Sequence, residues 1–187
     1  MTFYGGAGFC NSGRGVVFKV DARGRETVVH TFGGSDGANP DSTLLLDSQG
    51  NLYGTTANGG SSGCGGTGCG AVFELSKNET ETVLYAFCSL SNCADGEEPV
   101  GPLVSDSSGN LYGTTYFGGA TDNGVVFKLS TNGNETVLHG FTGGADGASP
   151  AAGLTMDSSG NLYGTTQGGG ATCYTSFTCG VVFKITH

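Results

Sequence analysis

The chain has 187 residues, of which 36% are hydrophobic, and no apolar run approaches the roughly 18 residues that a membrane helix needs. Seven Lys and Arg against sixteen Asp and Glu give a formal net charge of -9, which repels a phosphate backbone and argues against nucleic acid as a partner. The length suits one ordinary domain, and acidic loops favour cations, calcium in particular, although an acidic surface also serves solubility alone.

Four kinds of short segment recur in a fixed order, and each has the β-branched and aromatic composition of a strand. The chain opens with Thr2–Gly5, which resembles the second kind, strand b. Strand c follows at Gly15–Val20 and strand d at Glu26–Phe32. Strand a first appears at Leu44–Asp47, and strand b returns at Leu52–Thr56. The order then repeats, and the last recognisable segment is another strand c.

The repeat divides the chain into units of four strands. Equivalent Asp residues at 36, 95 and 146 are 59 and 51 residues apart, and the extra residues fall in loops. Periodic Gly and aromatic positions in such units are typical of propeller blades. We therefore predict an all-β chain, a β-propeller of four-stranded blades in a single unit, 1–187. The blades are 2–33 (strands b, c and d), 40–88, 99–141 and 150–186 (strands a, b and c).

The chain holds about 3.5 such blades and is incomplete at both ends. A few blades do not close a ring by themselves, and an unpaired sheet edge promotes aggregation. We therefore expect a homo-oligomer or a piece of a longer repeat chain.

Six of the seven cysteines form close pairs inside loops. The pairs are Cys64 with Cys69, Cys88 with Cys93, and Cys173 with Cys179, and Cys10 is left over. This arrangement predicts three local disulfides and an extracellular or periplasmic location. Zinc is the competing interpretation, but His is nearly absent from these loops and the spacing is not that of a zinc finger. Residues 1–8 lack the features of a signal peptide, so we expect that any export signal was removed or that the chain belongs to a longer one.

The loops of a blade separate into two faces. The a-to-b turns, which begin at Asp47, Asp106 and Asp157, are expected to tie their hairpins. The opposite face gathers the d-to-a and b-to-c loops, with carboxylates and aromatic rings near the central channel. There we predict calcium ligands at Asp36, Asp95, Asp146 and Glu97; catalytic groups at Glu97, Glu98 and Asp95; and substrate contacts at Tyr116, Phe117, Tyr174 and Phe177.

Glu97 and Glu98 attract attention because the sister repeats have Ala-Asn and Ala-Ser at these positions. The competing interpretation is that Asp36, Asp95 and Asp146 are Asp-Gly turn residues and that both Glu side chains are solvated. His30 and His139 share the strand-d position of Tyr85, which fits a filled site on an outer strand better than a catalytic one.

The phrases GNLYGTT, GVVFKL, ETVLH-F and DGA-P, in that order, resemble the Gloeo/Verruco tandem repeat of secreted bacterial proteins. This resemblance covers essentially the whole chain and carries little information about function. More distantly, the spacing Pro-x-x-x-Leu-x-x-Asp-x-x-Gly-Asn-Leu-Tyr is similar to the inner hairpin of NHL and gluconolactonase-type propellers. That similarity implies a propeller fold and calcium-dependent lactone hydrolysis, but the metal-binding residues of those propellers have no matching positions here.

Two functions follow as hypotheses. The first is a secreted calcium-assisted hydrolase, in which a bound cation helps water to attack a small lactone or ester. The second is a noncatalytic extracellular binding or scaffold module that holds a glycan or a protein on the same face. The chain has no Trp, which mildly disfavours sugar stacking as the way of binding.

Overall fold

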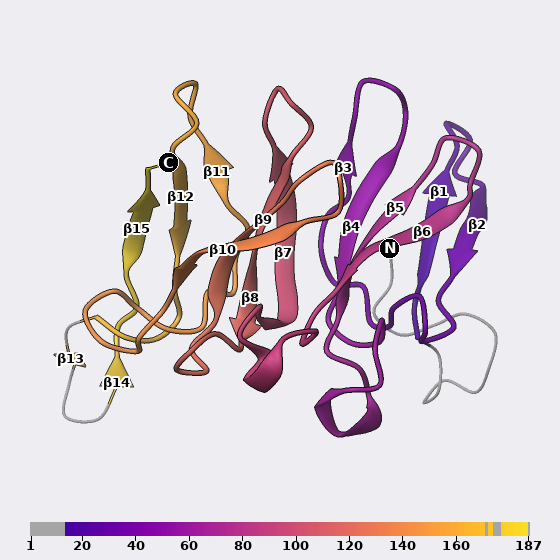
Figure 1. The fold of residues 1–187 in the computed structure, drawn as a ribbon. Coiled ribbons are helices and arrows are strands. Elements are labelled where there is room, and N and C mark those ends of the chain that lie inside the picture. Colours follow the sequence, from indigo (N-terminus) through magenta and orange to yellow (C-terminus); the bar gives the residue numbers. More distant parts are fainter. Residues whose placement is uncertain (1–13, 171, 174–176, 187) are drawn as a thin grey trace.

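The computed structural model describes residues 14–170, 172–173 and 177–186, and this part of the chain is nearly all β, as predicted (Figure 1). Its only helical segments are two short 3₁₀ turns in loops. The elements are β1 (Val16–Val20), β2 (Glu26–Thr31), β3 (Leu45–Leu46), β4 (Leu52–Thr56), η1 (Cys64–Gly66), β5 (Ala71–Leu75), β6 (Glu81–Ala86), η2 (Ser91–Cys93), β7 (Glu97–Ser105), β8 (Leu111–Phe117), β9 (Val125–Leu129), β10 (Glu135–Gly140), β11 (Thr155–Met156), β12 (Leu162–Thr165), β13 (Thr172–Cys173), β14 (Phe177–Thr178) and β15 (Val182–Ile185).

The strands form antiparallel sheets that stand side by side along the chain (Figure 1). Two sheets are complete four-stranded meanders, with the orders β3-β4-β5-β6 and β7-β8-β9-β10. They are flanked by β1-β2 and by β11-β12-β15. The fold is therefore the predicted β-propeller of four-stranded blades, open in this chain. The strand expected at Thr2–Gly5 lies outside the described residues.

The hydrophobic core lies between neighbouring sheets, and one aromatic contact repeats at each junction. The Phe that follows an outer strand meets, edge to face, the Phe in the third strand of the next sheet. The pairs and centroid distances are Phe32–Phe73 at 5.1 Å, Phe87–Phe127 at 5.0 Å and Phe141–Phe183 at 5.1 Å. Edge-to-face packing at these distances is favourable, so these rings hold each blade against the next.

The Gly of the repeated Leu-Tyr-Gly-Thr segment leaves space for the ring in the adjacent strand. A Cβ added to Gly113 would lie 2.6 Å from Cζ of Phe127 and 2.9 Å from Cδ2 of Leu103. Gly54 and Gly164 are crowded by the equivalent Phe and Leu side chains. This glycine is thus required by close packing inside each sheet.

Each a-to-b turn is tied by its Asp, as the sequence predicts. The Asp106 carboxylate accepts hydrogen bonds from Ser108 N at 2.8 Å, Asn110 N at 3.0 Å, Asn110 Nδ2 at 2.7 Å and Tyr112 Oη at 2.9 Å. Asp47 and Asp157 have the same set of donors. Bonds led by the one from the Asn161 side chain lower the pKa of Asp157 to about 2.

The third sheet differs from the expected pattern, because its inner strand begins earlier. β7 starts at Glu97, which pairs with Phe117 of β8, whereas the sister repeats hold this position with single bridges, Ala38 to Asn58 and Ala148 to Gly168. Aromatic residues favour strands more than Asn or Gly do, which accounts for the longer pairing. Glu97 and Glu98 therefore lie on a strand and not in the predicted loop.

A second difference is the hairpin β13–β14 in the loop between β12 and β15, which the sequence did not predict. Among the described residues, no helix has the length and apolar character needed to span a bilayer.

Candidate functional site

Glu98 has a backbone conformation that its side chain disfavours. Its φ is 56°, in the left-handed region, and the equivalent residues Asn39 and Ser149 have φ values of 56° and 51°. Asn tolerates this region well, whereas Glu does not. The Glu98 N–H donates to the carbonyl of Cys69 at 2.9 Å, which fixes the strand entry. The Glu98 backbone is thus held in this conformation at a conformational cost.

Four carboxylates near the start of β7 interact in series through their charges: Asp41 with Glu98, Glu98 with Glu97, and Glu97 with Asp122. We call these four residues the acidic run. Burial raises the pKa of Glu98, and the negative charges of Asp41 and Glu97 raise it further. Burial and the charge of Asp122 raise the pKa of Glu97. Burial also raises the pKa of Asp41. These groups therefore favour a proton or a cation more than solvated carboxylates do.

The predicted catalytic and metal residue Asp95 is fully buried and serves its own loop. Its carboxylate accepts hydrogen bonds from Tyr85 Oη at 2.8 Å, Ser89 N and Oγ at 2.9 Å each, and Leu90 N at 3.2 Å. With this many donors, its oxygens are occupied. Asp95 fixes the loop that leads into Glu97.

Asp36 and Asp146 have the same role in their own loops. Asp36 accepts from Gly33 N at 2.8 Å and Gly34 N at 2.9 Å, and it lies 3.0 Å from His30 Nε2. Asp146 accepts from the amide and hydroxyl of Thr142 and lies 3.3 Å from His139 Nε2. Within the described residues, the structure does not gather Asp36, Asp95, Asp146 and Glu97 into one group of ligand atoms. Asp36, Asp95 and Asp146 are therefore turn residues that accept hydrogen bonds within their own loops, as the competing interpretation of the sequence states.

His30 lies beside two carboxylates. The ligand atoms of His30, Asp36 and Glu81 lie within 4.8 Å of one another, although Glu81 comes from the next sheet. Oε1 of Glu81 is buried and has no hydrogen-bond partner in the described part of the chain. The sequence signal for this contact was weak, because it depends on how one blade lies against the next.

Of the four predicted substrate contacts, the structure describes the side chains of Tyr116 and Phe117. Tyr116 and Phe117 stack edge to face at 4.7 Å, and the Tyr116 hydroxyl donates to Gln167 Oε1 at 3.0 Å. The Phe117 side chain is 38% exposed and lies opposite Glu97 across the β7–β8 pair. Directly opposed residues share one face of a sheet, so this ring borders the acidic run. Tyr174 lies outside the described residues, and so does the side chain of Phe177.

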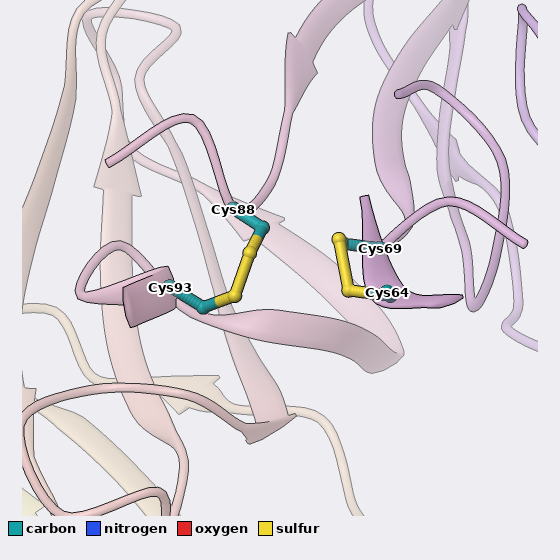
Figure 2. A group of neighbouring side chains, drawn as sticks. All are labelled: Cys64, Cys69, Cys88 and Cys93. Carbon is teal, nitrogen blue, oxygen red and sulfur yellow. A yellow bond between two sulfur atoms is a disulfide. The ribbon is translucent and has the colours of Figure 1, made fainter. Parts of the chain in front are cut away.

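Two of the predicted disulfides, Cys64–Cys69 and Cys88–Cys93, are present (Figure 2). Cys179 is also disulfide-bonded, but the side chain of its predicted partner Cys173 lies outside the description, as does all of Cys10. The disulfides are consistent with an oxidising compartment.

A polar pocket of about 660 Å³ opens among the loops of the first two sheets. Hydrogen-bonding side chains predominate in its lining, including those of Arg14, Asn39, Asn58, Ser61 and Thr67. Such a lining suits a hydroxyl-rich ligand better than an apolar one.

Two solved structures are similar to this chain at low sequence identity. A gluconolactonase from Xanthomonas campestris is 16% identical with a TM-score of 0.49; the match covers 82% of this chain and 50% of that protein. A luciferin-regenerating enzyme is 16% identical with a TM-score of 0.38, over 98% of this chain and 76% of that one. The chain thus spans only half of the gluconolactonase. No curated protein matches the sequence significantly.

At such identities and TM-scores, function has to be argued from the chain's own residues. The family model of the Gloeobacter/Verrucomicrobia repeat matches residues 1–183, which confirms the resemblance seen in the repeated phrases. The chain belongs to the Gloeobacter/Verrucomicrobia repeat family.

Proposed function

We propose that this chain is a secreted hydrolase of a small lactone or ester and that it works with calcium at the acidic run. The observation that carries the proposal concerns Glu98. Its backbone has a φ of 56°, and the pKa of its carboxyl group is raised by burial and by the charges of its acidic neighbours. Asn39 and Ser149 share the left-handed conformation, so the repeat imposes it, and the feature peculiar to this position is that a Glu side chain is placed there. The sister repeats, which lack both Glu residues, serve as internal references.

Calcium prefers carboxylate oxygens as ligands. Asp41 in the β2–β3 loop and Glu97 at the start of β7 offer them next to Glu98. Within the described residues, the three carboxylates are not gathered within 4.8 Å of one another, so a bound ion would have to draw them together. Their mutual repulsion, seen in the raised pKa of Glu98, is relieved by a bound cation. When bound, calcium would polarise the substrate carbonyl and lower the pKa of a water molecule.

The residues of the chain would supply the remaining chemistry. In this proposal calcium would be held by Asp41 and Glu97. The ionised Glu98 carboxylate accepts a proton from the water that attacks the carbonyl carbon, and gives this proton to the leaving-group oxygen as the carbon–oxygen bond of the ester breaks. Phe117 and Tyr116 give an apolar border for the acyl part of the substrate. Asp95 is a positioning residue, because it fixes the loop ahead of Glu97.

The test uses the residues of the sister repeats as replacements. Glu98→Asn introduces the residue found at Asn39, which accepts the left-handed conformation, and Glu97→Ala introduces the residue found at Ala38. With a panel of small lactones and esters, Glu98→Asn should lower kcat/KM by roughly 10²-fold or more, as loss of a general base does. Its melting temperature should stay the same or rise, because the backbone strain is relieved.

Unchanged hydrolysis by Glu98→Asn would exclude the proposed role of this residue. A fall in activity that is matched by a fall in melting temperature would point to lost structure, so both quantities are measured on each variant.

The polar pocket supports a second candidate, a noncatalytic module that binds a glycan. Asn58, Ser61 and Thr67 can hydrogen-bond sugar hydroxyl groups, and Arg14 adds a positive charge suited to an acidic sugar. Glycan binding that is lost on Asn58→Ala, in a chain that hydrolyses none of the lactones or esters, would favour this module over the hydrolase.

A further inference from the structure

Four cysteines from two separate loops meet at one place on the second sheet. Cys64 and Cys69 lie in the β4–β5 loop, and Cys88 and Cys93 lie in the β6–β7 loop. Their four sulfur atoms all lie within 4.8 Å of one another, and the two disulfides stand side by side (Figure 2). The convergence of the two loops is not visible in the sequence spacing.

The two disulfides do not account for this convergence. Each joins residues only five positions apart, and neither links one loop to the other. A disulfide that closes so short a loop removes little entropy from the unfolded chain compared with one that closes a long loop. Two local disulfides would serve equally well if the loops lay apart.

Both loops are longer in this repeat than in the next one, by five and by three residues. The two insertions occur in the same repeat, and each brings two cysteines to the common cluster. Cys69 is 1% exposed and belongs to the core between the second and third sheets, and Cys64 and Cys88 pack against that core. The cluster is therefore shielded from water on one side, as structural metal sites are.

The spacing of the sulfur atoms suits a closed tetrahedral site. Four thiolates bound to zinc at about 2.3 Å place their sulfur atoms about 3.8 Å from one another, which is compatible with the observed cluster. A set of four sulfur ligands selects zinc over calcium or magnesium, which prefer oxygen.

We propose that, when both disulfides are reduced, the four cysteine thiolates bind one zinc ion that links the β4–β5 loop to the β6–β7 loop. The reductant is an external dithiol: for each disulfide it gives up two electrons and two protons and becomes a disulfide itself. The four cysteine thiols then release their protons to water as zinc binds. In the reverse direction an external disulfide takes two electrons from each cysteine pair and two protons from water and becomes two thiols; the two protein disulfides re-form and the ion is released, so the site has two alternative cross-linked states.

The experiment reduces the 187-residue chain anaerobically, removes the reductant and titrates it with zinc and with cobalt. Wild type should bind one ion per chain by native mass spectrometry. With cobalt it should show the thiolate charge-transfer and tetrahedral absorption bands. Cys64→Ser and Cys88→Ser remove one ligand from each loop. Since the loss of an outer-shell partner alone weakens metal binding up to about 100-fold, the loss of a direct ligand should weaken it by more than this.

A triple variant, Cys10→Ser with Cys173→Ser and Cys179→Ser, removes every other cysteine and should keep the site intact. Circular dichroism of each reduced, metal-free variant establishes that the sheets persist before titration. Three results would overturn the proposal: no ion bound by reduced wild type, full binding by Cys64→Ser or Cys88→Ser, or loss of binding in the triple variant.

Discussion

The half-buried Glu135 side chain lies beside Asp95 of the β6–β7 loop. Burial, followed by the negative charge of Asp95, raises the pKa of Glu135 to about 7. Its Oε1 is buried and has no hydrogen-bond partner among the described residues. The ionised form of this side chain is therefore the costly one in the folded chain.

This arrangement predicts how stability depends on pH. Because the folded pKa lies above the ordinary value of 4.5, the folded chain binds more protons than the unfolded chain between about pH 4.5 and pH 7. Stability therefore falls as pH rises through this window. Partial exposure screens the effect, so the expected loss is about 1–2 kcal/mol. Urea unfolding on either side of the window should show this loss in wild type and little of it in Glu135→Gln.

The equivalent residue Glu26 in the first sheet provides the control, because its side chain is exposed. Glu26→Gln should leave the pH dependence of wild type unchanged. An equal fall in stability for wild type and Glu135→Gln would show that another group is responsible.

At the scale of single residues, the sequence indicated part of the candidate site. Comparison of the repeats singled out Glu97 and Glu98, because Ala, Asn and Ser replace them elsewhere. It did not show that residue 98 has a left-handed conformation or that Asp41 of the preceding unit acts on Glu98. That contact depends on the packing of one blade against the next, which spacing along the chain does not encode.

The sheets depend on the glycine that faces the Phe ring repeated in each third strand. Gly113→Ala would place a methyl group 2.6 Å from Phe127, in a strand whose backbone is otherwise compatible with Ala. Overpacking of this kind should cost about 1–3 kcal/mol. Thermal or urea unfolding of Gly113→Ala would measure the loss, and Gly140→Ala, where the added methyl group meets no atom within 4 Å, separates steric crowding from a general glycine effect.

Gly140 has no positive φ, so its replacement by Ala carries neither the cost of a left-handed backbone nor a clash. A double variant, Gly113→Ala with Phe127→Leu, should recover part of the stability lost by Gly113→Ala. No recovery would mean that the ring is not what excludes the methyl group.

At the scale of elements, the four-strand unit could be read from the sequence because alternating and β-branched residues recur in a fixed order. The longer β7 was not predicted because the blade was expected to begin at residue 99, whereas Glu97 already pairs with Phe117. The hairpin β13–β14 was missed because it lies in a loop whose length varies between repeats. Variable loops carry no repeat from which their structure can be inferred.

In the whole molecule, the last sheet has an uncovered edge. Val182 of β15 is 80% exposed, whereas its equivalents Val17, Val72 and Val126 are at most 1% exposed. In the described residues, no outer strand pairs with β15. An exposed apolar edge of this kind favours pairing with another chain.

We therefore expect the 187-residue chain to self-associate through this edge in solution. Val182→Lys should shift the measured mass toward that of one chain, because a charged side chain on an edge strand opposes pairing. Light scattering after size exclusion measures this, with Lys184→Arg on the same strand as the control. If wild type has the mass of a single chain, the edge is not an association site for this chain.

The central claim, calcium-assisted hydrolysis at the acidic run, is tested most directly by one rate. The rate of lactone and ester hydrolysis by the wild-type chain is measured with calcium in excess and again after its removal by a chelator. The account predicts measurable hydrolysis that falls at least about 100-fold on chelation and returns when calcium is restored. Hydrolysis at the same rate under both conditions, or no hydrolysis of any substrate with calcium present, would contradict it.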